Sequence, residues 1–149
     1  MAYCSNSDLQ NIRSTIMSYG TVDWSDFIAL ADTAIDDDLE VKWYRKAANE
    51  AGYDWRSTPY DADLMLNSAS QLLNLACAKT FFLIYRYLAQ DTTAELDAYG
   101  QQRDYWDYYY GQELIRVVEK GIDYDWNSSG VIGDSEKSRK RPARRIKRV

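Results

Sequence analysis

A calcium-loop pattern stands near the end of the sequence, in residues 125–136 (DWNSSGVIGDSE). Oxygen donors alternate along it as in the loops that hold Ca²⁺, with a glycine at the sharp turn and a glutamate last. The ligands would be Asp125, Asn127, Ser129, the carbonyl of Val131, and Glu136. However, Ser129 is neutral where Asp or Asn is usual, and no amphipathic helix follows. The pattern therefore favours an Asx turn closed by its own side chains over a calcium site, and we expect no other cofactor.

The last residues of the chain form a basic arm, at residues 138–149. Seven of the final eleven residues are Lys or Arg, and Pro142 prevents a continuous helix. Guanidinium groups pair bidentately with carboxylates, so this composition suits an acidic site on another protein. The candidate partner-binding residues are Arg139, Lys140, Arg141, Arg144, Arg145, Ile146, Lys147, Arg148 and Val149. A solubilising tail and a nucleic-acid-binding or localisation arm are the alternatives.

The charge is divided unevenly along the chain. Residues 1–133 hold 10 Lys and Arg against 21 Asp and Glu, a net charge of 10 − 21 = −11. Residues 134–149 hold 8 basic and 2 acidic residues, a net charge of 8 − 2 = +6. Only the arm would be attracted to DNA, because the rest of the chain repels phosphate.

Aromatic residues are concentrated in one short segment. The chain has 13 Tyr and 5 Trp, and five aromatic residues lie within six positions: Tyr105, Trp106, Tyr108, Tyr109 and Tyr110. Successive residues of a helix turn by about 100°, so these rings cannot all face one core. They are either boundary residues, with packed rings and hydroxyls in water, or part of a subunit interface, where Tyr and Trp are enriched.

The densest acidic run is formed by Asp36, Asp37, Asp38 and Glu40. Consecutive residues on a helix point in different directions, so these carboxylates do not converge on one ion. The run predicts a solvated helix face.

The composition disfavours several classes of protein. Without histidine, the chain lacks triads that use it, imidazole metal ligands and the usual proton shuttle at neutral pH. Two cysteines, Cys4 and Cys77, do not make a disulfide framework, and they fit a reducing compartment. The longest apolar run, residues 81–85, is far too short to cross a membrane, and no targeting segment is apparent. We expect no enzyme, no membrane partner and a single domain with one core.

Apolar residues recur at three- and four-residue steps, which predicts an all-α bundle of about four helices. A first helix would start at a serine cap, Ser5 or Ser7, and Thr92 or Thr93 would cap the last. The expected elements are a short helix ending at Gly20, a helix over about 24–50, a loop over 52–60, a helix over 61–89 and a helix ending at Gly121. Residues 61–89 are apolar around most of the circumference, so this helix should be enclosed by the others.

The chain thus divides into a helical bundle (1–121), a polar turn (122–137) and the extended basic arm (138–149). This layout, with the segment AELDAYGQQRDYWDYYYGQELIRVVEKGI followed by DYDWNSSGVIG and the arm, resembles the head-to-tail connector, or adaptor, proteins of tailed bacteriophages. In that family a helical bundle forms a ring of twelve copies below the portal. The C-terminal arm reaches into the portal subunits, and DNA passes through the lumen.

The resemblance implies a structural virion protein at the head-tail interface, made in the host cytoplasm. Its partners would be the portal protein, further copies of itself in a homo-oligomeric dodecamer, and the next tail or connector protein. DNA would pass through without sequence-specific binding. The main alternative is a small DNA-associated regulatory protein that binds through the arm, and a third is a metal-dependent enzyme without a recognised motif.

Overall fold

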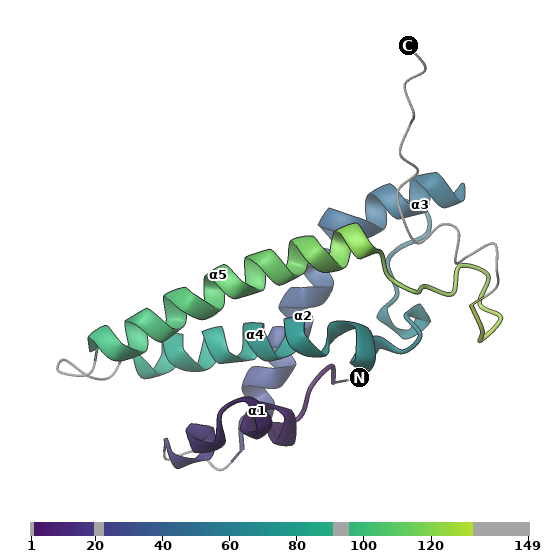
Figure 1. Ribbon diagram of the computed structural model, residues 1–149. Helices are drawn as coiled ribbons and strands as arrows, with labels where there is room; N and C mark the ends of the chain where they lie inside the picture. Colours follow the sequence, from purple (N-terminus) through teal and green to yellow (C-terminus); the bar gives the residue numbers. More distant parts are fainter. Residues whose placement is uncertain (1, 20–22, 91–95, 133–149) are drawn as a thin grey trace.

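The computed structural model describes residues 2–19, 23–90 and 96–132, which form an all-α fold (Figure 1). Short 3₁₀ and π segments accompany the α-helices, and no strand is formed by the described residues. One isolated bridge joins Met65 and Tyr124. The predicted all-α bundle is confirmed.

The N-terminal helix, α1 (Asn6–Ile12), begins with a capping box. Ser5 accepts a hydrogen bond from the backbone N–H of Asp8, whose carboxylate accepts one from the N–H of Ser5. The helix ends because Arg13 is extended, and a 3₁₀ helix, η1 (Ser14–Ser18), follows. The prediction of a single helix up to Gly20 was therefore wrong. The break at Arg13 leaves the side chain of Ile12 exposed, whereas Ile16 is buried in the core.

The second helix is continuous but has three parts. It begins as α2 (Ser25–Leu39), widens into one π-helical segment, η2 (Glu40–Tyr44), and ends as α3 (Arg45–Ala51). Gly52 stops it with φ +86°, a left-handed conformation that favours glycine. The expected helix over about 24–50 and the loop after it are thus confirmed. The π segment places Trp43 and Tyr44 next to each other in the core.

The central helix is α4 (Ser68–Leu88). The expected start at residue 61 was wrong, because a 3₁₀ helix, η3 (Ala62–Leu64), and Asn67 with φ +55° precede it. Its largest fully buried side chains are Leu72, Leu75, Phe81, Ile84 and Tyr85. As predicted, α4 is enclosed, since α1, α2 and α5 all pack on it.

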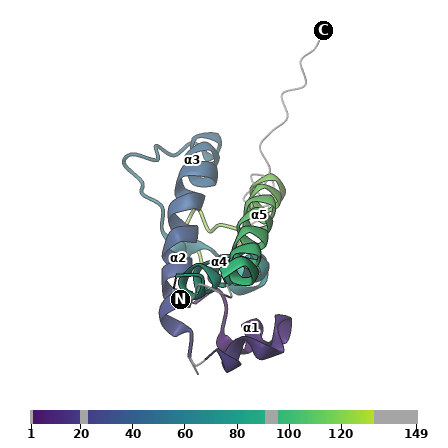
Figure 2. The same cartoon turned by 90° about the vertical axis from the view of Figure 1, so that its left-hand side faces the viewer.

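The last helix, α5 (Leu96–Lys120), runs antiparallel to α4 along its length (Figure 1). It ends as predicted at Gly121, which has φ +83°. The capping threonines predicted for its start lie outside the described residues. A view turned by 90° shows α2 and α5 on two sides of α4 (Figure 2). The molecule therefore has two long outer helices, each with one face against α4 and one face turned away.

Candidate functional site

Helix α5 is fixed to the rest of the chain by its inner face. Trp106 stacks on Phe81 of α4, with ring centroids 4.6 Å apart. The hydroxyl of Tyr110 donates to the carboxylate of Asp38 on α2, over 2.5 Å. Leu114 and Val117 complete this inner face. The helix is thus a rigid support for whatever its outer face carries.

The structure divides the five clustered aromatic residues into two groups. Tyr110 is buried, and Trp106 and Tyr109 are half-buried against the chain's own core. Tyr105 and Tyr108 are 55% and 69% exposed. Of the predicted subunit-interface residues, Tyr110 is therefore a core residue, and only Tyr105 and Tyr108 are more than half exposed.

A third apolar side chain extends this exposed surface. Ile115 lies seven residues after Tyr108, on the same side of the helix, and is 54% exposed. We call Tyr105, Tyr108 and Ile115 the outer face of α5. A groove of about 760 Å³ runs beside Tyr108 and Ile115. Its charged lining is mixed, with Lys42 of η2, Lys79 of α4, and Asp107 and Glu119 of α5. Exposed aromatic and aliphatic side chains beside a groove are typical of surfaces that bind another protein.

The segment after α5 folds back onto the bundle before it reaches the polar turn. Ile122, Tyr124 and Trp126 are buried, and Trp126 stacks on Tyr44 and Tyr53. The core therefore continues beyond the boundary predicted at residue 121. This packing fixes the chain to the bundle as far as Trp126.

The polar turn is closed by its own hydrogen bonds. The buried carboxylate of Asp125 accepts from the backbone N–H groups of Ser129 (3.0 Å) and Gly130 (2.7 Å). Asn127 also accepts from the N–H of Ser129, and the Ser129 hydroxyl donates to the carbonyl of Val131 (2.9 Å). These contacts confirm the Asx-type turn.

The calcium interpretation of the same residues stays a prediction. In the described residues, no group of three or more acidic or sulfur side chains comes together as a metal site. The predicted glutamate ligand, Glu136, lies outside them. Asp125, Asn127 and Ser129 are close together, as the pattern predicted, and the side-chain oxygens of Asp125 and Asn127 both accept from the N–H of Ser129 within the turn.

The acidic run on α2 has a different role from the one predicted. Asp36 accepts hydrogen bonds from the hydroxyls of Tyr3 (2.5 Å) and Tyr60 (3.1 Å), and Asp38 accepts from Tyr110. Only Asp37 is fully on the surface. The prediction that this run forms a solvated helix face was wrong for Asp36 and Asp38. Their carboxylates do point in different directions, as expected, because they bind different partners. Burial is the main cause that raises the pKa of Tyr3 and Tyr60, which therefore stay protonated donors.

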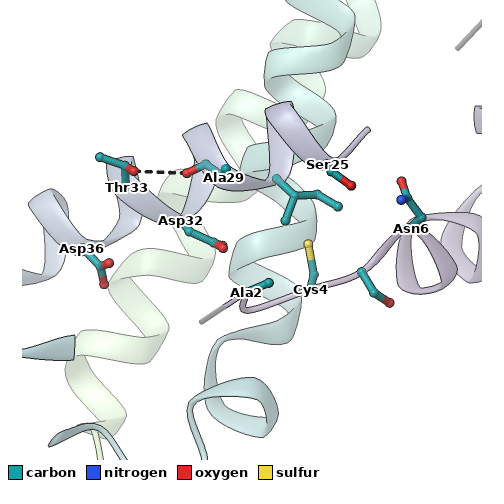
Figure 3. A pocket seen from close by; sticks show the side chains of 10 residues that line it. Ala2, Cys4, Asn6, Ser25, Ala29, Asp32, Thr33 and Asp36 are labelled. Carbon is teal, nitrogen blue, oxygen red and sulfur yellow. Dashed lines mark hydrogen bonds between the residues drawn. The ribbon is translucent and has the colours of Figure 1, made fainter. Parts of the chain in front are cut away.

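A cavity of about 560 Å³ lies between α2 and the N-terminal segment (Figure 3). Asp32 and Cys4 are among the side chains that line it. Burial raises the pKa of the Asp32 carboxyl to about 6, nearby Asp36 adds to this, and the N–H of Tyr3 opposes it. This carboxyl is thus a weaker acid than an ordinary surface aspartate.

The two cysteines are buried free thiols. Cys4 lies 3.8 Å from the hydroxyl of Thr80, one turn after Cys77 on α4. The interaction with the Cys4 thiol, together with burial, raises the pKa of Cys77. The two cysteines tie the N-terminal segment to the central helix by packing.

The basic arm, with all nine predicted partner-binding residues, lies outside the described residues.

A helix that crosses a bilayer must be long and continuously apolar, and no helix in the described ranges meets both conditions.

No protein-family model, curated protein or solved structure matches the chain.

Proposed function

We propose that the chain is a head-to-tail connector subunit of a tailed bacteriophage, a structural protein that acts by assembly. The observation that carries the proposal is the outer face of α5. Three large apolar side chains, Tyr105, Tyr108 and Ile115, point away from the bundle on a helix that its inner face holds rigidly. Such a surface suits a permanent contact with another subunit, because burial of its rings removes apolar area from water.

The charge distribution supports the same role. The bundle and turn are strongly acidic, and the arm is strongly basic. An acidic ring lumen lets DNA slide, since it neither binds phosphate nor releases counterions. The arm, by contrast, would insert into an acidic site between portal subunits, with Ile146 and Val149 as apolar anchors. This division of charge agrees with the resemblance of the sequence to connector proteins.

The arm's role is tested by deletion of residues 138–149. The arm has few apolar residues and follows the core, so the truncated chain should keep its helical circular dichroism spectrum and its unfolding midpoint. It should lose binding to the cognate portal protein in a pull-down or by analytical ultracentrifugation. A full-length variant with residues 138–149 in scrambled order keeps the arm's charge and serves as the control. The affinity of this variant for the portal should be at least tenfold lower than that of the full-length chain with the native arm sequence.

Two results would contradict this proposal. If the truncated chain binds the portal as well as the full-length chain does, the arm is only a solubilising tail. If the arm instead gives tight binding to duplex DNA, with an affinity that falls steeply as salt rises, the DNA-associated regulator is the better explanation.

A further inference from the structure

The fold brings the two free cysteines together from distant parts of the chain. Cys4 lies in the N-terminal segment before α1, and Cys77 lies in the middle of α4. The Cys4 thiol is 3.8 Å from the hydroxyl of Thr80, which follows Cys77 by one helical turn on the same side of α4. Both cysteines are buried, with exposed fractions of 6% and 1%. The two thiols therefore share one small region of the core.

The two thiols interact with each other. The interaction with the Cys4 thiol is the main cause that raises the pKa of Cys77, and burial and the carboxylate of Asp8 add to it. Cys77 therefore stays a protonated thiol beside Cys4 at neutral pH. Both residues are free cysteines in this structure, so the pair is in its reduced form.

The N-terminal segment is held in place on both sides of Cys4. The hydroxyl of Tyr3 donates a hydrogen bond to the carboxylate of Asp36 on α2, over 2.5 Å. On the other side, Ser5 begins the capping box of α1. Cys4 itself belongs to no helix, so its backbone can adjust to the specific geometry that a disulfide requires. Cys4 is thus kept near α4 but is free to reorient.

Cys4 borders the cavity between α2 and the N-terminal segment (Figure 3). This cavity has a volume of about 560 Å³, and Cys77 does not line it. The carboxylates of Asp32 and Asp36 do line it, so an uncharged reagent meets less repulsion there than an anionic one. A small reagent that enters the cavity would therefore reach Cys4 before Cys77.

We infer that Cys4 and Cys77 are a dithiol that small, uncharged disulfides oxidise to an intrachain disulfide. The Cys4 thiolate attacks one sulfur of the reagent and forms a mixed disulfide, and the other half of the reagent leaves and takes up a proton. Cys77 then loses its proton to solvent and attacks the Cys4 sulfur. The bond between Cys4 and Cys77 forms as the second half of the reagent leaves and is protonated. Two protein thiols are oxidised, and one reagent disulfide is reduced to two thiols.

Oxidation would turn a packing contact into a covalent one. The bond would join positions 77 − 4 = 73 apart, and the loop that it closes would contain α1, α2 and α3. A cross-link over a long loop lowers the entropy of the unfolded chain, so the midpoint of thermal unfolding should rise by about 5 °C or more. This inference goes beyond the proposed function, since it holds whatever the chain assembles with.

Oxidation of the full-length chain by bis(2-hydroxyethyl) disulfide tests the inference. The folded chain is incubated with this uncharged reagent at about pH 8, quenched with acid and analysed by intact mass and peptide mapping. It should lose two hydrogen atoms, and the peptides that contain Cys4 and Cys77 should be joined.

Two matched variants separate the steps. Cys77→Ser replaces the second sulfur by oxygen, so its reaction should stop at the mixed disulfide on Cys4. In Cys4→Ser, the core covers the remaining thiol, so Cys77 should react at least tenfold more slowly than Cys4 does in the native sequence. Circular dichroism checks that both variants keep the helix content of the native chain, and the alanine variants at the same positions replace any variant that does not.

Several results would overturn the inference. A native chain that does not react, or that keeps the mixed disulfide on Cys4 without an internal bond, would show that the two thiols do not meet. Disulfide-linked dimers on a non-reducing gel, in place of the internal bond, would show the same. A midpoint that falls on oxidation would show that the fold does not accommodate the bond. Fast reaction of Cys77 in Cys4→Ser would overturn the order of attack. None of these results concerns binding to the portal, so the proposed function is tested separately.

Discussion

Neighbouring carboxylates on α2 have very different environments. Asp36 accepts hydrogen bonds from two tyrosine hydroxyls and Asp38 from a third, whereas Asp37 between them is exposed to solvent. The helical turn separates the three side chains, as the sequence alone predicts. Their partners could not be predicted, because Tyr3 and Tyr110 lie 33 and 72 positions away in sequence. Such contacts depend on how helices pack, and local spacing does not encode that.

Asp32 gives a pH-dependent prediction at the same scale. Its pKa is about 6 in the folded chain against an ordinary value of 3.8, so the folded state binds a proton more tightly than the unfolded state. The free energy of unfolding should therefore fall as pH rises from about 4 to about 6. Above about pH 6 the contribution of Asp32 to the free energy of unfolding should no longer change with pH. Asp32→Asn removes the charge. It should stabilise the chain by about 1 kcal/mol at pH 7, a reduced value because the carboxyl is half exposed.

Urea unfolding at pH 4 and pH 7 measures this effect. At pH 4 the variant should gain little, since Asp32 is already largely protonated in the folded state. Asp37→Asn is the control on the same helix, and its exposed side chain should give no such difference. A gain from Asp32→Asn that is equal at both pH values would contradict the assigned cause.

At the scale of the elements, periodic apolar residues predicted α2 through α3 and most of α4 and α5. The breaks were harder to predict. One break lies at the extended Arg13 and the other at the left-handed Asn67, so neither is marked by a glycine or a proline. Both backbone conformations depend on how the neighbouring segments pack. The exposed apolar residues Leu30 and Ile115 went unassigned, although each falls outside its helix's buried stripe. A helical-wheel count could have found them, but only the fold shows that they lie on different sides.

The segment after α5 gives a prediction about this packing. Trp126 is buried among Trp43, Tyr44, Tyr53 and Tyr124. Trp126→Ala should lower the free energy of unfolding by about 3 to 5 kcal/mol, because a large aromatic side chain leaves a cavity. Thermal or urea unfolding followed by circular dichroism measures the loss.

Val131→Ala is the matched control for that variant. Val131 lies in the same segment but is exposed, so its truncation should change the free energy of unfolding by less than about 0.5 kcal/mol. Equal losses for the two variants would show that the segment is not anchored through Trp126.

For the whole molecule, the sequence predicted the all-α class and the separation of an acidic body from a basic arm. It also placed aromatic residues at a surface, but it could not tell which of the five face outward. That distinction depends on how α5 is rotated about its own axis, which places Trp106 against Phe81 and leaves Tyr105 and Tyr108 outside. The exposed apolar side chains of α5, Tyr105, Tyr108 and Ile115, are the feature of the fold on which the proposed assembly rests.

The mass of the assembled protein tests the central claim, that the chain acts as a connector subunit. Native mass spectrometry or multi-angle light scattering would be applied to the full-length chain alone and after mixing with the cognate portal ring. A connector should add a fixed number of copies to the portal, close to twelve, and should bind duplex DNA only weakly under the same conditions. A chain that stays monomeric, leaves the portal's mass unchanged and binds duplex DNA tightly would contradict the account.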